Sequence, residues 1–267
     1  MKPLLSVVAG AALALIAQSG ARASDMPIKS NLSSPVIPSG WSGFYLGANG
    51  GGGWERQTFD QSFFLPVEFG FFPPGPPNQI TTISGNGGVF GGQFGYNWQP
   101  FANWIAGIEA DIEGTTIKGI TSKTNFNPAL PSLDTNRLET KIRDLGTMRA
   151  KIGFAPLETV LVYGTAGLAW GRVSSSLSLS SSPSLFAPLP PFFVGTVTQL
   201  GWSAGIGADW RLAQNLILGV LYLHYDLGSG PQTVTAVASN GSVDANILPN
   251  STVRVDSVTA RLSWLIR

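Results

Sequence analysis

The chain has 267 residues, of which only 12% are charged and 43% are hydrophobic, and it contains no cysteine. Its formal net charge of +1 gives no reason to expect nucleic acid or an acidic substrate as a partner. The lack of cysteine excludes disulfide-stapled and cysteine-zinc scaffolds, and the charged fraction lies well below the roughly 25% of soluble domains.

The N-terminal residues have the pattern of an export signal. Lys2 precedes an apolar run from Leu4 to Ala17, and the A-R-A sequence at 21–23 follows as a cleavage site. The run is shorter than the ~20 apolar residues that a membrane-spanning helix needs, because Gln18 interrupts it. The expected organisation is a cleaved signal peptide over 1–23, a periplasmic N-terminal lead over 24–40 and the folded domain over 41–267.

From residue 41 onward, apolar and polar side chains alternate repeatedly with a period of two, which is typical of a strand with one apolar face. The last stretch is the clearest, because every even position from Val258 to Ile266 is apolar while positions 257, 259, 261 and 263 carry Ser, Thr, Arg and Ser. Eight such segments follow one another: 41–54, 87–98, 104–115, 142–154, 160–172, 197–210, 216–227 and 253–266.

The connections between these segments are alternately long and short. The short ones are 99–103, 155–159 and 211–215, and the long ones are 55–86, 116–141, 173–196 and 228–252. Short turns on one side and long loops on the other are typical of a barrel of the outer membrane, whose long loops face outside. The sequence therefore predicts an all-β fold, an eight-stranded antiparallel transmembrane β-barrel with short periplasmic turns and long external loops.

Tryptophan placement agrees with that topology. Seven tryptophans share the apolar parity of their strands and lie near strand ends, as expected for aromatic girdles at the two membrane interfaces. The expected periplasmic girdle consists of Trp98, Trp104, Trp210 and Trp264, and the external one of Trp54, Trp170 and Trp202.

Charged residues on the polar parity form the candidate site of this barrel. The cluster comprises Glu109, Asp111, Arg149, Lys151, Asp209 and Arg261. The interior of an eight-stranded barrel is just filled by its own side chains, and an isolated buried charge there costs several kcal/mol. We therefore expect these charges to act as a coupled set, with Arg149 and Arg261 compensating Glu109 and Asp209, either as a salt-bridged plug or as the gate of a narrow pore.

Five motifs follow in order along the predicted strands: WSGFYLG at 41–47, AGIEAD at 106–111, LGTMRAKIG at 145–153, VYGTAGLAWG at 162–171 and DLG at 226–228. Together they resemble the outer-membrane immunogenic protein family of small porin-like β-barrels, over nearly all of the mature chain. The resemblance implies an eight-stranded barrel in the Gram-negative outer membrane, often surface-exposed and antigenic, without a defined enzymatic role.

Two positions depart from the pattern of that family. Leu221 precedes Tyr222 where the family commonly has a glutamate, so one charge expected in the lumen is missing. The family tends to end on an aromatic residue that the barrel-assembly machinery reads, whereas Arg267 is the last residue here. We expect the machinery to read Trp264 and Ile266, which keep the apolar parity.

No catalytic, cofactor-binding or metal site is expected. Residues 201–205 match the G-x-S-x-G pattern of a hydrolase nucleophile elbow, but that motif needs a strand-to-helix turn, and the strand alternation continues through it. His224 is the only histidine, which excludes a cluster of metal-binding histidines, and its position beside Tyr222 and Tyr225 favours the membrane interface. A barrel-embedded lipid enzyme would need a His–Ser pair, and no serine lies near His224 on its strand.

The sequence thus predicts a structural or surface-interaction protein of antigen-like character, with a largely charge-plugged lumen. A narrow porin or small-solute channel is the main alternative, followed by a lipid-modifying enzyme. Expected partners are outer-membrane lipid and lipopolysaccharide, the assembly machinery and an unknown ligand of the external loops. We expect a monomer that binds no nucleic acid.

Overall fold

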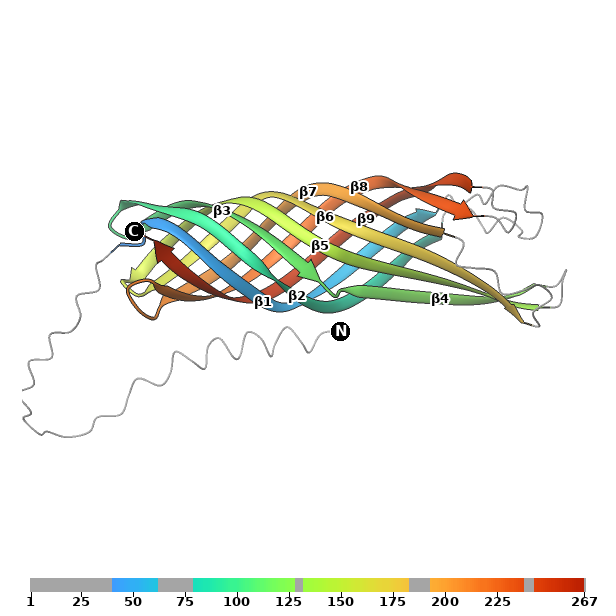
Figure 1. The fold of residues 1–267 in the computed structure, drawn as a ribbon, viewed down its shortest axis with the longest axis horizontal. Coiled ribbons are helices and arrows are strands. Elements are labelled where there is room, and N and C mark those ends of the chain that lie inside the picture. The colour runs from blue at the N-terminus through green and yellow to red at the C-terminus, as the bar shows by residue number, and fades with distance from the viewer. Residues whose placement is uncertain (1–39, 62–78, 128–131, 183–192, 238–242, 267) are drawn as a thin grey trace, which may run out of the picture. The chain divides into compact units, whose positions relative to one another are not determined.

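The computed structural model describes residues 40–61, 79–127, 132–182, 193–237 and 243–266. The expected signal peptide, the expected lead except Gly40, and Arg267 lie outside the described residues. No helix within the described ranges is long and apolar enough to cross a membrane. These residues form the strands of one antiparallel sheet (Figure 1): β1 (Gly43–Gln61), β2 (Gln79–Phe101), β3 (Trp104–Thr115), β4 (Lys118–Asn127), β5 (Ser132–Leu157), β6 (Val160–Ser182), β7 (Phe193–Arg211), β8 (Leu216–Val237) and β9 (Val243–Ile266).

The sheet closes into a barrel, because β1 pairs with β2 along one edge and with β9 along the other. β3 and β4 share one place in the ring, since both pair with β2 on one side and with β5 on the other. Only Thr116 and Ile117 separate these two strands. The ring therefore has eight places, and the predicted eight-stranded antiparallel barrel is confirmed.

The two ends of the barrel differ in their connections (Figure 1). At the short-turn end, residues 102–103, 158–159 and 212–215 join consecutive strands. At the opposite, long-hairpin end, the strands continue beyond the predicted segments, so that β5 begins at Ser132 and β6 continues to Ser182. The apolar alternation weakens in these extensions, because a hairpin beyond the lipid does not need an apolar outer face. Strand pairing thus extends into segments that the sequence led us to expect as loops.

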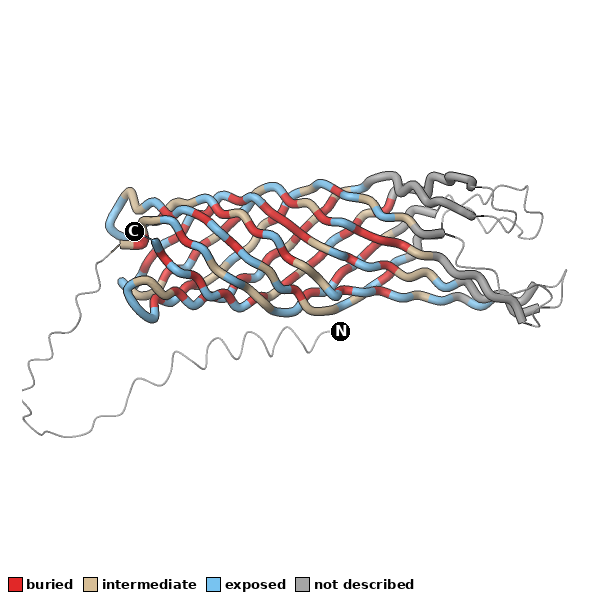
Figure 2. Tube along the Cα trace, in the orientation of Figure 1, coloured by how far each residue is buried: buried red, intermediate tan, exposed pale blue. Residues whose placement is uncertain are grey.

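Side chains alternate between a buried inner face and an exposed outer face along the described strands (Figure 2). On β3, Glu109 and Asp111 are buried, whereas Ile108 and Ile112 are 59% and 67% exposed. This pattern reverses that of a soluble protein, in which charged groups are exposed and large apolar patches are rare. The outer wall is therefore suited to lipid, and the polar chemistry of the molecule lies in its lumen.

Candidate functional site

All six predicted cluster residues lie inside the barrel, and each is at most 7% exposed. They come from four strands of the ring: β3, β5, β7 and β9. Because successive side chains of a strand point to opposite faces of the sheet, each of the six lies on the inner face. The register between strands then sets the height of each residue along the barrel axis. Glu109 lies directly opposite Arg149 in the β3–β5 pair, so this ion pair joins register neighbours.

Glu109 is the centre of the network. Its Oε1 accepts a hydrogen bond from Arg149 Nη2, and its Oε2 accepts one from Arg261 Nη2. Tyr45 Oη donates to the same Oε2 at 2.6 Å. One carboxylate therefore links β1, β3, β5 and β9 across the lumen, with charge-assisted bonds that are roughly twice as strong as neutral ones.

Arg149 also holds a second carboxylate. Its Nη2 lies 2.6 Å from Asp111 Oδ2, and Thr147 Oγ1 donates to Asp111 Oδ1 at 2.8 Å. Arg149 Nη1 donates in turn to Thr147 Oγ1 at 2.6 Å. Arg149 is fully buried, so its charge depends on these protein partners rather than on bulk water.

Asp209 pairs with Lys151, with Nζ 3.1 Å from Oδ2, where the sequence led us to expect an arginine. Lys151 Nζ lies 3.8 Å from the centre of the Tyr163 ring, and the Tyr163 hydroxyl accepts a hydrogen bond from Arg261 Nη1 at 2.9 Å. Tyr163 therefore joins the Lys151–Asp209 pair to the Glu109 centre. The cluster contains three cations and three carboxylates, so it is formally neutral.

Sequence reasoning missed the tyrosines that complete this network. Tyr45 and Tyr163 are buried in the lumen, and so is Tyr225, the neighbour of His224, for which the sequence predicts a place at the membrane interface. Tyr225 donates to Glu113 Oε2 at 2.8 Å, which adds a buried carboxylate beside the predicted six. The signal was present, because all three tyrosines share the inner parity of their strands, but an aromatic residue near a strand end also fits a girdle.

Glycines opposite the tyrosines create the space for them. A Cβ atom at Gly95 would lie 2.5 Å from Tyr45 Oη, and one at Gly207 would lie 2.4 Å from Tyr163 Cζ. Gly95 sits between Tyr45 and Glu109 in the register of β1, β2 and β3, so the Tyr45 side chain crosses β2 to reach the carboxylate. The large lumen side chains fit because neighbouring inward positions carry no side chain.

Trp41 and Arg211 pack together at the short-turn end. Trp41 is 2% exposed, unlike the girdle tryptophans, and the Arg211 guanidinium lies 4.4 Å from the centre of its ring. Arg211 Nη2 donates to the Gly40 carbonyl at 2.7 Å, and the Trp41 amide donates to Gln99 Oε1 at 2.9 Å. These contacts fix the chain where it enters the barrel.

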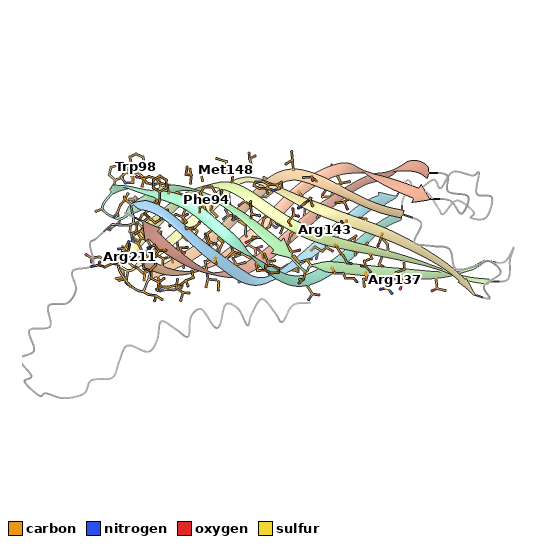
Figure 3. The ribbon with its side chains drawn as sticks, viewed as in Figure 1. Phe94, Trp98, Arg137, Arg143, Met148 and Arg211 are labelled. Atoms are coloured by element: carbon orange, nitrogen blue, oxygen red, sulfur yellow. The ribbon has the colours of Figure 1, made fainter. Side chains whose placement is uncertain are left out.

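The seven tryptophans of the expected girdles all lie on the outer wall. Six of them are between 43% and 59% exposed, and Trp170 is half-buried. Trp98 projects from the outer wall at the short-turn end (Figure 3). Trp264 and Ile266 are also exposed on this wall, so a partner could reach them there.

The two enzyme-like features lie on opposite faces of the wall. Residues 201–205 belong to the continuous strand β7, and Ser203 is fully buried in the lumen. His224 is half-buried on the outer wall, where its Nδ1 contacts Asp256 Oδ1 at 2.8 Å and its ring centre lies 5.6 Å from that of the tilted Trp202 ring. Within the described part of the chain, no three acidic or imidazole side chains gather as metal ligands would.

Comparison with known proteins gives a family match over almost the whole chain. The family model described as "Outer membrane protein beta-barrel domain" matches residues 8–264. The 31 kDa outer-membrane immunogenic protein of Brucella melitensis biotype 1 is 31% identical over 200 residues, 73% of this chain and 75% of the relative. The 22 kDa outer membrane protein of Rhizobium leguminosarum bv. viciae is 26% identical over 209 residues, 74% of this chain and 73% of that protein.

Solved structures with a similar arrangement have much lower sequence identity. The outer membrane protease OmpT from Escherichia coli is 9% identical, with a TM-score of 0.48, and the match covers 84% of this chain and 97% of that one. Neisserial surface protein A is 12% identical, with a TM-score of 0.37, over 84% of this chain and 98% of that one.

Proposed function

This chain belongs to the outer membrane protein beta-barrel family and resides in the outer membrane, and from that premise we propose a structural and surface-interaction role with a lumen closed by an ion-paired plug. The observation that carries the proposal is the buried network around Glu109, in which Arg149, Arg261 and Tyr45 all contact one carboxylate. Side chains from several walls meet there, which supports a closed lumen.

Energetics supports the same conclusion. An open aqueous pore leaves its charges hydrated, so they need no protein partner. Here Arg149 and Arg261 are at most 4% exposed, and each contacts a carboxylate. Removing one partner of such a buried pair costs about 3–5 kcal/mol, so the network resists being pulled apart by a passing solute.

The long-hairpin end supports the surface part of the proposal. In barrels of the outer membrane, the short turns face the periplasm and the long connections face outside. The extended strands therefore project from the cell surface, where a ligand of the loops would meet them. The Brucella relative is named an outer-membrane immunogenic protein, which supports an antigen-like role for this chain.

We propose no enzymatic role. A lipid-modifying enzyme of the expected type would need a serine within reach of a histidine. His224 instead contacts Asp256 on the outer wall, while Ser203 lies buried on the other side of the sheet. The curated relatives are named outer-membrane or immunogenic proteins, which supports the same reading.

A narrow channel is the second candidate, because some inward polar atoms have no hydrogen-bond partner among the residues that the structure describes. These include Asn97 Oδ1 towards the short-turn end and Glu55 Oε2 and Gln57 Oε1 towards the long-hairpin end. Buried polar groups of this kind are ordinarily satisfied by water, which favours hydrated regions on both sides of the plug.

Single-channel recording in planar bilayers separates the two candidates. The mature chain, refolded and checked for its heat-modifiable folded band, is added to a bilayer at neutral pH and symmetrical salt. The plug predicts a silent trace. Regular, voltage-independent steps that scale with the amount of folded protein would replace the plug with a narrow channel.

A further inference from the structure

Positive charge gathers on the outer wall near the long-hairpin end. We define the basic patch as Lys118 on β4 together with Arg137, Lys141 and Arg143 on β5. Lys118, Arg137 and Lys141 have side chains 40–53% exposed, and Arg143 is also exposed. Figure 3 shows Arg143 and Arg137 along this wall, with Arg137 nearer the hairpin end.

The patch lies just beyond the hydrocarbon-facing wall. Phe154 on β5 pairs with Trp104 of the short-turn girdle, and Arg143 lies on the same strand towards the hairpin end. At ~3.3 Å per residue and a tilt of about 40°, the stretch between Phe154 and Arg143 rises roughly 28 Å along the barrel axis. An outward apolar band is about 25 Å tall, so Arg143 lies at the interface, Lys118 and Lys141 lie in the headgroup zone, and Arg137 lies farther out along the hairpin.

The positive charge of the patch is only partly compensated. Lys118 and Lys141 are directly opposite each other in the β4–β5 pair, an arrangement of like charges that is destabilising by itself. Glu139 Oε1 lies 3.0 Å from Lys118 Nζ and 3.1 Å from Lys141 Nζ, and its Oε2 lies 3.9 Å from Arg137 Nη2. One carboxylate thus compensates three cations, and Arg143 adds a fourth cation to the patch.

Two outward arginines at the same end have carboxylates of their own. Arg172 lies 2.6 Å from Asp144, and Arg254 lies 3.0 Å from Asp226. This contrast distinguishes the β4–β5 wall from the parts of the wall that carry Arg172 and Arg254, whereas the exposed Arg56 on β1 has no carboxylate partner among the described residues.

A β-bulge sets the direction of Arg143. The register of β5 against β6 shifts between Ile142 and Asp144, so Arg143 and Asp144 both face outward. Arg143 Nε donates to Ser174 Oγ at 2.8 Å, which fixes the Arg143 side chain against β6. Among the residues the structure describes, no acceptor contacts its two Nη groups. A guanidinium held in this way presents a planar pair of donors, the geometry that matches phosphate oxygens.

The wall beneath the patch is apolar. Ile112, Met148 and Leu168 face outward there and are 67%, 59% and 68% exposed. An occupant must therefore have an anionic head at the cations and hydrocarbon below them. We propose that the basic patch binds the phosphate of a phosphorylated lipid of the outer leaflet, the lipid A portion of lipopolysaccharide. This site is independent of the lumen plug.

Binding is tested with the refolded mature chain in detergent micelles. Native mass spectrometry measures retention of bis-phosphorylated lipid A, of the same lipid A after enzymatic dephosphorylation, and of inorganic phosphate. We expect the phosphorylated lipid to bind most tightly and to weaken with added salt. The variant K118Q/K141Q should bind it about 30-fold more weakly, the factor expected for two cations lost near an anionic surface.

Two matched variants make the test specific. R172Q/R254Q removes the same charge from the same end, but from arginines that already have aspartate partners, and should leave binding nearly unchanged. E139Q removes the carboxylate from the patch and should tighten binding. All variants are first checked for the heat-modifiable folded band, and Arg143→Gln replaces the double variant if that protein fails to fold.

Three results would overturn the proposal. The first is equal retention of phosphorylated and dephosphorylated lipid A by the wild type. The second is an equal loss of binding in K118Q/K141Q and R172Q/R254Q, which would mean that only net charge matters. The third is displacement of the lipid by millimolar inorganic phosphate alone, which would indicate a free-phosphate site. A conducting lumen would contradict the plug and leave this proposal standing.

Discussion

Replacing Arg149 with alanine tests the plug most directly, because this side chain bridges two carboxylates. The substitution removes the partners of Glu109 Oε1 and Asp111 Oδ2 together. Glu109 keeps Arg261 and Tyr45, whereas Asp111 keeps only the hydroxyl of Thr147 among the contacts described here. The main cost is therefore an uncompensated carboxylate at Asp111, and we expect a loss of about 3–5 kcal/mol in the free energy of unfolding.

The double variants follow from the same geometry. Adding Asp111→Ala to Arg149→Ala removes the stranded carboxylate and should recover part of the loss. Adding Glu109→Ala should recover less, because it also deprives Arg261 of its carboxylate. The coupling in each double-mutant cycle is expected within the range of about 0.5–3 kcal/mol found for residues in one network.

Urea titration of the barrel refolded into phospholipid vesicles, followed by tryptophan fluorescence, supplies these free energies. Conditions are chosen so that the folding and unfolding curves coincide, and Arg172→Ala on the outer wall serves as the control with little expected change. Additive losses in both cycles would refute the network. An Arg149→Ala barrel of unchanged stability that conducts ions would refute the plug itself.

Three further predictions test the packing and the two faces. Gly207→Ala should destabilise the barrel because its Cβ would meet the Tyr163 ring, whereas Gly164→Ala should not, because its Cβ would meet only the Gly205 carbonyl oxygen at 4.0 Å; equal unfolding midpoints would contradict the packing. Ala150→Arg on the outer wall should cost about 2–4 kcal/mol near the midplane, with Ala150→Leu as the tolerated control in the same urea titration. Hydrogen bonds from Lys118 and, second in size, Lys141 lower the pKa of Glu139. The stabilisation of the β4–β5 pair by Glu139 is therefore present above the ordinary glutamate pKa and is lost as pH falls through the lower pKa of the folded state. Amide exchange should show this loss, and Glu139→Gln should abolish the pH dependence.

Much of the fold follows from local pattern. A lipid-facing strand must present an apolar side chain at every second position, so the sequence carries one signal per strand, and the eight signals match the eight places in the ring. The apolar alternation weakens where a strand leaves the hydrocarbon of the membrane. The hairpin extensions, such as the part of β5 from Ser132 onward, are held by backbone pairing, for which the side chains give little indication.

The β-bulge in β5 and the choice of ion-pair partners could not be predicted from the apolar alternation for a different reason. The shift at Ile142 changes the parity of β5 within a single residue, and alternation on either side of it remains regular. Likewise, parity places Asp209 inside the barrel but says nothing of its height relative to Lys151 on another strand. Register and barrel stagger decide which charges meet, and neither is encoded in a single segment.

The lumen and the outer wall are linked by this same dependence on register. A glycine is needed on one strand where a tyrosine of the next strand leans across it, as Tyr45 leans across Gly95. The resulting bonds to Glu109 then constrain strands that are not neighbours in the ring. A barrel with a water-filled lumen has only its backbone ladder to fix the relative heights of opposite walls. Here the ion-paired centre adds a second constraint, which fixes the heights of these strands, and of the side chains on their outer faces, relative to one another.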